Sequence, residues 1–257
     1  MDPNNSKKIV FITGATSGIG EASANILANN YKLILCGRRE ERLLKIKNKL
    51  SKKTEVITLN FDVRSKEDVA DKINSLPKNW RKINILINNA GNAHGLDFID
   101  DGDIEDWDKM IDINIKGLLY VTKEILNLML INESGHIINI GSIAGKEVYP
   151  KGNVYCASKF AVDALSEGMR IDLVEKNIKV SQISPGLVNT EFSKVRFKND
   201  LEKAKNVYAG MEPLYAEDIA DIIKFIVERP DNVNISDLTV LPKSQASSVV
   251  VNRKTNI

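Results

Sequence analysis

The stretch Lys8–Gly20, KIVFITGATSGIG, decides the fold of this chain. It begins with a short apolar run rich in β-branched residues, which predicts a buried strand, and an amphipathic stretch to about Asn29 follows its glycines. Glycines between a strand and a helix let the backbone turn tightly and approach a pyrophosphate, whose charge the helix N-terminus favours. A glycine turn can also serve chain geometry alone, but this order favours a nucleotide-binding loop. The residues of the predicted loop are Gly14, Thr16, Ser17, Gly18, Ile19 and Gly20.

Apolar runs and amphipathic stretches alternate along the whole chain. Continuous apolar strands separated by helices imply a parallel sheet covered on both faces, and right-handed crossovers make it doubly wound. We therefore predict an α/β fold, in which residues 1–257 form one Rossmann-like domain with a seven-stranded parallel sheet. Residues 187–213 have no clean period, and we expect a loop with short helices that acts as a substrate lid. The other predicted strands are 32–36, 55–59, 83–87, 136–140, 178–183 and 238–241, and the longer predicted helices are 40–50, 104–130, 153–175 and 216–228.

Composition and charge argue against several classes of protein. The 36 basic residues are nearly matched by 34 acidic ones, and a formal net charge of +2 gives no electrostatic case for nucleic acid. Cys36 and Cys156 lack the spacing of a disulfide framework or a zinc site, so we expect no bound metal. The N-terminus lacks a signal-peptide core and no apolar run reaches membrane-spanning length, so we expect a cytoplasmic protein without a membrane partner.

The end of the second predicted strand, Gly37-Arg38-Arg39, bears on the choice of cofactor. NAD-selective folds place an acidic residue about here for the ribose 2′-hydroxyl, whereas an arginine accommodates a 2′-phosphate. Gly37 leaves room, and Arg38 supplies a planar, bidentate phosphate partner with Arg39 beside it. Both arginines can also be solvated residues at a helix start, but the pattern favours NADP(H) over NAD.

Further polar turns follow the third, fourth and sixth strands, at the sheet edge where such folds bind ligands. Asp62 and Val63 are expected to meet the adenine, with the carboxylate accepting from its amino group. Asn89, Ala90 and Gly91 would lie along the same cofactor. The turn after the sixth strand can enclose the nicotinamide and contact its carboxamide. It contains Pro185, Gly186, Val188 and Thr190.

Tyr155 and Lys159 lie four residues apart in the predicted helix 153–175 and therefore on one helix face. An ammonium there favours the phenolate and lowers the tyrosine pKa from about 10, so Tyr155 can act as a general acid or base on an alcohol or carbonyl. Taken alone, such a pair is more often an ordinary solvated face. Ser142 ends the fifth strand thirteen residues earlier, and the loop between can bring its hydroxyl and the phenol to one substrate oxygen.

Together these motifs resemble the short-chain dehydrogenase/reductase family over essentially the whole chain. The resemblance implies that Tyr155 is the general acid/base and that Ser142 holds the substrate oxygen. It also implies that Lys159 binds the nicotinamide ribose and that Asn114 holds a water in a proton relay. The motifs that carry it are 13–20, 88–91, Asn114, Ser142, Tyr155-x-x-x-Lys159 and Pro185-Gly186.

Residues 135–142, 152–155 and 187–197 are similar to one branch of that family, the NADP-dependent 3-hydroxy acid dehydrogenases. This similarity implies a small substrate such as serine, L-allo-threonine or 3-hydroxyisobutyrate, and a homotetramer with the long helices between subunits. A hydroxy acid brings a carboxylate that needs a donor, although charged residues of a surface loop usually face solvent. The candidates for substrate contact, besides Ser142, are Tyr149, Asn153, Lys194 and Arg196.

Two alternatives stay open. A carbonyl reductase of the same family would use the same residues on 3-oxoacyl thioesters, sugars or other ketones, because function depends on the site and not on the fold. A protein that senses NADP without turnover would be expected to have lost part of the catalytic set. That set is complete here and consists of Asn114, Ser142, Tyr155 and Lys159.

Overall fold

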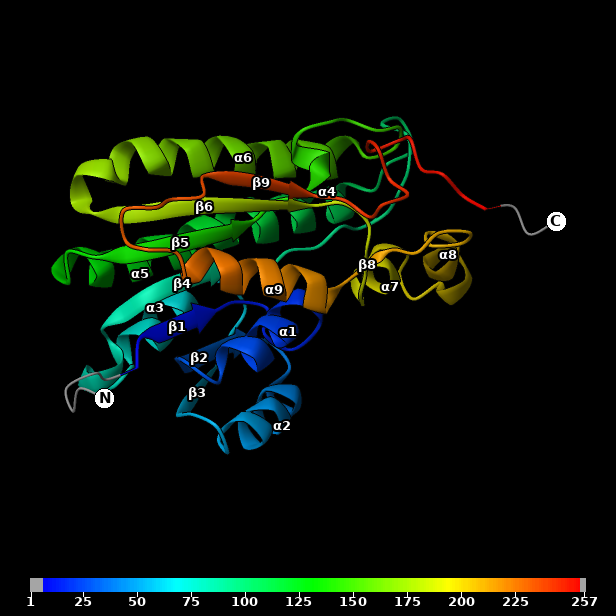
Figure 1. Ribbon diagram of the computed structural model, residues 1–257. Coiled ribbons are helices and arrows are strands. Elements are labelled where there is room, and N and C mark those ends of the chain that lie inside the picture. Colours follow the sequence, from blue (N-terminus) through cyan, green and yellow to red (C-terminus); the bar gives the residue numbers. More distant parts are fainter. Residues whose placement is uncertain (1–6, 255–257) are drawn as a thin grey trace.

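Seven parallel strands form one sheet in the computed structural model, which describes residues 7–254 (Figure 1). The strand order is β3-β2-β1-β4-β5-β6-β9, so the chain reverses direction across the sheet between β1 and β4. The predicted doubly wound, seven-stranded parallel sheet is confirmed. The strands are β1 (Ile9–Ile12), β2 (Lys32–Gly37), β3 (Val56–Asn60), β4 (Ile83–Asn88), β5 (Gly135–Ile140), β6 (Ile178–Pro185) and β9 (Asp237–Val240).

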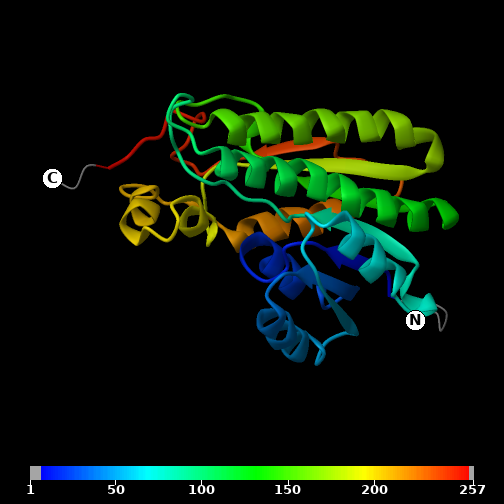
Figure 2. The ribbon, with the colours of Figure 1, turned by 180° about the vertical axis from the view of Figure 1, so that it is seen from behind.

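Helices cover both faces of the sheet (Figures 1 and 2). Successive side chains of a strand point to opposite faces, so Phe11 of β1 packs into one core cluster and Ile12 into the other. The first cluster lies under α3 (Lys66–Asn74), α5 (Leu118–Ile131) and α6 (Asn153–Leu173), and the second under α1 (Gly18–Leu27), α2 (Glu40–Leu50) and α9 (Ala216–Val227).

No helix among the described residues is long and apolar enough to cross a membrane.

The helix predicted over 104–130 is not continuous. It comprises α4 (Ile104–Ile111), a π-helical segment at Asp112–Gly117, and α5. A Cβ on Gly117 would collide with Val63, so the wide turn is packed tightly against the segment after β3. π-turns inside helices occur mostly at functional sites, and this one contains Asn114.

Residues 187–213 lie at the carboxyl ends of the strands (Figure 1). The expected short helices are present as α7 (Phe192–Arg196) and α8 (Leu201–Asn206), while a two-stranded parallel pair, β7 (Val188–Asn189) with β8 (Leu214–Tyr215), was not predicted.

His136 of β5 is a structural histidine, as expected. It is 5% exposed, and its Nε2 lies 2.8 Å from the Ser181 hydroxyl. Burial lowers the pKa of His136 to about 3, with a smaller contribution from the positive charges of Lys179 and Lys8. The folded protein therefore holds this imidazole neutral at every pH near neutrality.

Acidification should destabilise the protein through His136. Between pH 6.5 and 3 the unfolded state binds a proton on His136 and the folded state does not. Each unit by which the pH falls in this range therefore lowers the free energy of unfolding by up to about 1.4 kcal/mol. The measurement is the free energy of unfolding in urea at pH 7.5 and at pH 5. We expect its decrease between these two pH values to be about 2 kcal/mol smaller for His136→Gln than for the wild type. Equal losses in the two proteins would contradict a neutral buried His136.

Candidate active site

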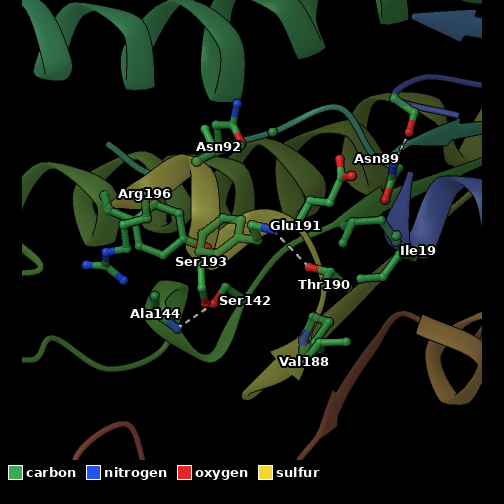
Figure 3. Close-up of a pocket in the computed structure, with 18 of the residues that line it drawn as sticks. Ile19, Asn89, Asn92, Ser142, Ala144, Val188, Thr190, Glu191, Ser193 and Arg196 are labelled. Atoms are coloured by element: carbon green, nitrogen blue, oxygen red, sulfur yellow. Dashed lines mark hydrogen bonds between the residues drawn. The ribbon is translucent and has the colours of Figure 1, made fainter. Parts of the chain in front are cut away.

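A cavity of about 570 Å³ opens at the carboxyl ends of the strands, within the size range of small-molecule sites (Figure 3). Its wall combines the glycine turn after β1, the ends of the central strands, the start of α6 and the segment after β6. All of the predicted site residues line it except Gly20, Asn114, Asn153 and Lys194. Residues far apart in the chain meet here because parallel strands end at one edge of the sheet.

The glycine turn has the geometry that its sequence predicted. Gly14 and Gly18 have φ values of +64° and +54°, the left-handed region that favours glycine. Gly20 lies behind the cavity wall, where a Cβ would collide with the carbonyl oxygen of Gly14. The Thr13 hydroxyl accepts from the backbone N–H of Asn89 at 3.0 Å and so joins the turn to the end of β4.

Arg38 and Arg39 differ in how they are held. Arg38 is half-exposed, with Nη1 3.6 Å from an Asp62 oxygen. Arg39 donates to the hydroxyls of Thr16 and Ser17, at 2.9 and 2.8 Å from Nη2. In this structure the two hydroxyls therefore orient a guanidinium of the cavity wall.

Asp62 has a partner that sequence reasoning missed. Arg64 donates to both oxygens of the carboxylate, at 3.1 Å from Nε and 2.7 Å from Nη2. Burial raises the pKa of Asp62, but the hydrogen bonds from Arg64 outweigh burial and lower it below its usual value. The two-residue spacing in a turn could have suggested this pair.

Tyr155, Ser142 and Lys159 lie together at the floor of the cavity. Tyr155 and Lys159 are on the inner face of α6, one turn apart, and both are buried. The Lys159 ammonium donates to the carbonyl of Ile140 at 2.9 Å, which holds it against the end of β5. The Ser142 hydroxyl accepts from the Ala144 backbone N–H at 3.1 Å (Figure 3).

The electrostatics of the pair differ from the expectation. Burial raises the pKa of Tyr155 above its usual value, and the Ser142 hydroxyl and the Arg196 guanidinium oppose it only in part. Burial also lowers the pKa of Lys159, to about 8. The predicted lowering of the tyrosine pKa is therefore wrong for this structure, because burial of Tyr155 outweighs the groups that lower its pKa.

Asn114 lies behind the cavity, where protein groups occupy its amide. Its Oδ1 accepts from the Asn92 backbone N–H at 2.8 Å, and its Nδ2 donates to the Asn92 carbonyl at 2.8 Å and to the Ser158 hydroxyl at 3.0 Å. A Cβ on Gly91 would lie 3.0 Å from Asn114 Oδ1 and 3.6 Å from Lys159 Nζ. Asn114 thus fixes the loop after β4 against the helix that bears Tyr155.

Arg196 places a cation of the cavity wall beside the Tyr155 ring. Its guanidinium carbon lies 5.5 Å from the ring centroids of Tyr155 and Tyr149, and its Nη1 donates to the Tyr149 hydroxyl at 2.9 Å. Its Nε donates to the Gly95 carbonyl at 3.2 Å. Figure 3 shows Arg196 on the opposite side of the pocket from Ile19 of the glycine turn.

Asn153 does not reach this cavity. Its amide donates to the Asp97 carbonyl at 3.0 Å and lines a separate, much smaller cavity with His94. Lys194 is exposed on α7 and lines neither cavity. Helix direction explains the place of Asn153, because Asn153 and Tyr155 are two positions apart on α6 and point to different sides.

Comparisons with known proteins agree with this geometry. The model of the short chain dehydrogenase family matches residues 8–201. The chain is 44% identical over 240 residues to an NADP-dependent 3-hydroxy acid dehydrogenase of Salmonella typhi, covering 93% of this chain and 96% of that one. It is 41% identical over 251 residues to one of Schizosaccharomyces pombe, covering 96% and 97%.

Solved structures are similar over nearly the whole chain. The closed form of a serine dehydrogenase complexed with NADP⁺ superposes with a TM-score of 0.90 at 40% identity, covering 96% of this chain and 100% of that one. The serine dehydrogenase from Escherichia coli has a TM-score of 0.80 at 37% identity, covering 93% and 99%.

Proposed function

This chain belongs to the short-chain dehydrogenase family, and we propose that it is an NADP-dependent oxidoreductase of small 3-hydroxy acids. Hydride would pass between the hydroxyl-bearing carbon of the acid and the nicotinamide. The relatives named for 3-hydroxy acids, and the neighbours named for serine, support this class of substrate. Serine, L-allo-threonine and 3-hydroxyisobutyrate are the proposed types.

One observation carries the proposal: Arg196 lies beside Tyr155, with the guanidinium carbon 5.5 Å from the centroid of the phenol ring. In a 3-hydroxy acid the carboxylate carbon is two bonds from the carbon that bears the hydroxyl. A substrate whose hydroxyl meets the Tyr155 oxygen would therefore present its carboxylate towards this guanidinium. Arginine binds carboxylates through two parallel hydrogen bonds, which fixes orientation as well as charge. A neutral alcohol would bring no negative charge to this guanidinium.

Tyr155 is the proposed general acid/base, which takes the hydroxyl proton in oxidation and returns it in reduction. Ser142 would hold the substrate oxygen beside it. The raised pKa of the buried Tyr155 keeps the phenol protonated at rest, which suits proton donation to a carbonyl. Lys159 would bind the nicotinamide ribose, and Asn114 would hold a water of the proton relay.

The residues present fit an NADP(H) cofactor. A Cβ on Gly14 would lie only 2.8 Å from Asn89 Nδ2 and 3.0 Å from the Ala90 Cα, so the turn packs directly against the end of β4, and both line the cavity that would take the pyrophosphate. Arg38 and Arg39 offer cations for a 2′-phosphate. The nicotinamide, when bound, supplies the hydride chemistry, and this chain supplies position and proton transfer.

The test is to follow NADPH formation from L-serine, L-allo-threonine and 3-hydroxyisobutyrate, each with NADP⁺ and with NAD⁺. We expect turnover of at least one acid, with kcat/KM about 100-fold lower for NAD⁺, since two charge-assisted hydrogen bonds are lost. Activity confined to an acetoacetyl thioester or a ketone would instead identify a carbonyl reductase. NADPH binding without any turnover would identify a sensing protein.

We also propose that residues 187–213 act as a lid and that the protein is a cytoplasmic homotetramer. Cys36 and Cys156 are free, buried thiols, which supports a reducing compartment. Several apolar side chains on α5 and α6 are exposed, which supports an interface there, and sedimentation velocity would give the subunit number. They are Leu119, Leu130, Ile131, Phe160 and Ile171.

A further inference from the structure

The carboxylate of Glu191 joins two parts of the cavity wall that are far apart in the sequence. Glu191 immediately precedes α7, and its oxygens accept from Arg39 Nη1 at 2.8 Å and from Arg42 Nη1 at 2.9 Å. Both arginines belong to the start of α2, about 150 positions earlier. Their hydrogen bonds outweigh burial and hold the pKa of Glu191 below its usual range, so the carboxylate is charged at neutral pH.

Arg39 is shared between the glycine turn and Glu191. Its Nε and Nη2 donate to Thr16 and its Nη2 also to Ser17, while its Nη1 is committed to Glu191. Next to Glu191, the Thr190 side chain lies against Gly18, where an added Cβ would be 3.3 Å away. The segment after β6 is thus fastened to the turn by van der Waals contact and by an ion pair.

The charges at this end of the cavity do not cancel. Four arginines and two carboxylates lie together here, and the group they form has two more positive than negative charges. Arg42 neutralises Glu191, and Arg64 neutralises Asp62, so Arg38 and Arg39 keep charge for a phosphate. A phosphate that draws on Arg39 would therefore act on the same guanidinium that holds Glu191. The members of the group are Arg38, Arg39, Arg42, Arg64, Asp62 and Glu191.

α7 connects this group to the substrate side. Glu191 precedes the helix and Arg196 is its last residue, a separation of about 7.5 Å along the axis. In Figure 3, Glu191 lies on the side of Ile19 and Arg196 on the opposite side. A short helix held at its first turn has little freedom at its last, so the position of Glu191 constrains the position of Arg196.

We propose that Glu191 is a positioning residue that clasps the lid to the arginines which read the cofactor phosphate, and so couples cofactor retention to the placement of Arg196. The proposal rests on the proposed function for the identity of the cofactor and of the acid. It assigns Glu191 no contact with reacting atoms.

Two variants separate a clasp from a simple charge effect. Glu191→Gln removes a negative charge near the phosphate site, and Arg42→Met removes a positive one. If only the charge mattered, the two variants would change NADPH affinity in opposite directions. A clasp is lost in Glu191→Gln and weakened in Arg42→Met, which leaves Glu191 with Arg39 alone. Arg42 does not line the cavity, so its loss removes no cofactor contact.

We expect both variants to release NADPH about fivefold to tenfold faster in stopped-flow displacement by NADP⁺. The KM of the hydroxy acid should rise by a similar factor with kcat within about twofold, because Arg196 is less well placed. The double variant should release NADPH no faster than Glu191→Gln alone, because that change already removes both contacts of the carboxylate. Opposite effects of the two variants, or unchanged release rates in both, would overturn the clasp.

Trypsin sensitivity provides a readout that needs no turnover. Both variants should be cleaved several-fold faster within 187–213, which contains Lys194, Lys198 and Lys203. The control is Glu55→Gln, which breaks an ion pair with Lys32 away from the cavity and should change neither readout. Failure of the wild type to bind NADPH would refute the proposed function. Unchanged trypsin cleavage in both variants would refute the clasp, whether or not NADPH binds.

Discussion

Tyr155→Phe is expected to lower kcat about 1,000-fold or more while NADPH still binds. The change removes only the phenolic oxygen, which is the group proposed to exchange a proton with the substrate hydroxyl. General acid–base catalysis contributes about 10²- to 10⁴-fold, and this change removes the group proposed to supply it. The ring would remain packed against Phe192, whose centroid is 5.6 Å away, so the cavity should keep its shape.

The measurement combines steady-state turnover with NADPH titration by fluorescence. Tyr31→Phe is the matched control, since it removes the same oxygen from another buried tyrosine that does not line the cavity. A Tyr155→Phe enzyme within about tenfold of the wild type would refute the role of this residue. Loss of NADPH binding would show a structural defect instead. Turnover of Ser142→Ala would then test the proton path.

Arg196→Leu is expected to lower kcat/KM for 3-hydroxyisobutyrate about 100-fold, mainly through KM. A bidentate, charge-assisted pair contributes about 2–3 kcal/mol, and it would bind ground state and transition state alike. The Tyr149 hydroxyl would lose its donor at the same time, but its ring can stay in place. Steady-state kinetics over a wide range of acid concentration measure this effect.

Two controls make the Arg196 experiment specific. Lys194→Leu removes a positive charge two residues away on the same helix, from a side chain that lines no cavity, and should change kcat/KM by less than about twofold. The neutral analogue 2-methylpropane-1,3-diol keeps the hydroxyl and lacks the carboxylate. Wild type should prefer the acid over the diol, and Arg196→Leu should not. An unchanged preference would place the carboxylate elsewhere in the cavity.

The sequence by itself determined the fold and most of the cavity wall. Strand and helix periods depend on neighbours within a few residues, and the parallel topology brings the ends of β1, β4, β5 and β6 to one edge. The pairing of Tyr155 with Lys159 follows from helix geometry alone. The choice of Arg38 and Arg39 as the cationic end of the cavity follows from their place directly after β2.

Only the tertiary structure decided how these groups are charged and held. The pKa of Tyr155 is raised because the pair is buried, and depth of burial is not readable from a four-residue spacing. Asn153 is excluded from the cavity by the direction in which α6 presents it. The contacts of Glu191 with Arg39 and Arg42 join segments about 150 positions apart. Such contacts depend on how residues 187–213 pack against the sheet edge, and no local pattern in the chain encodes that packing.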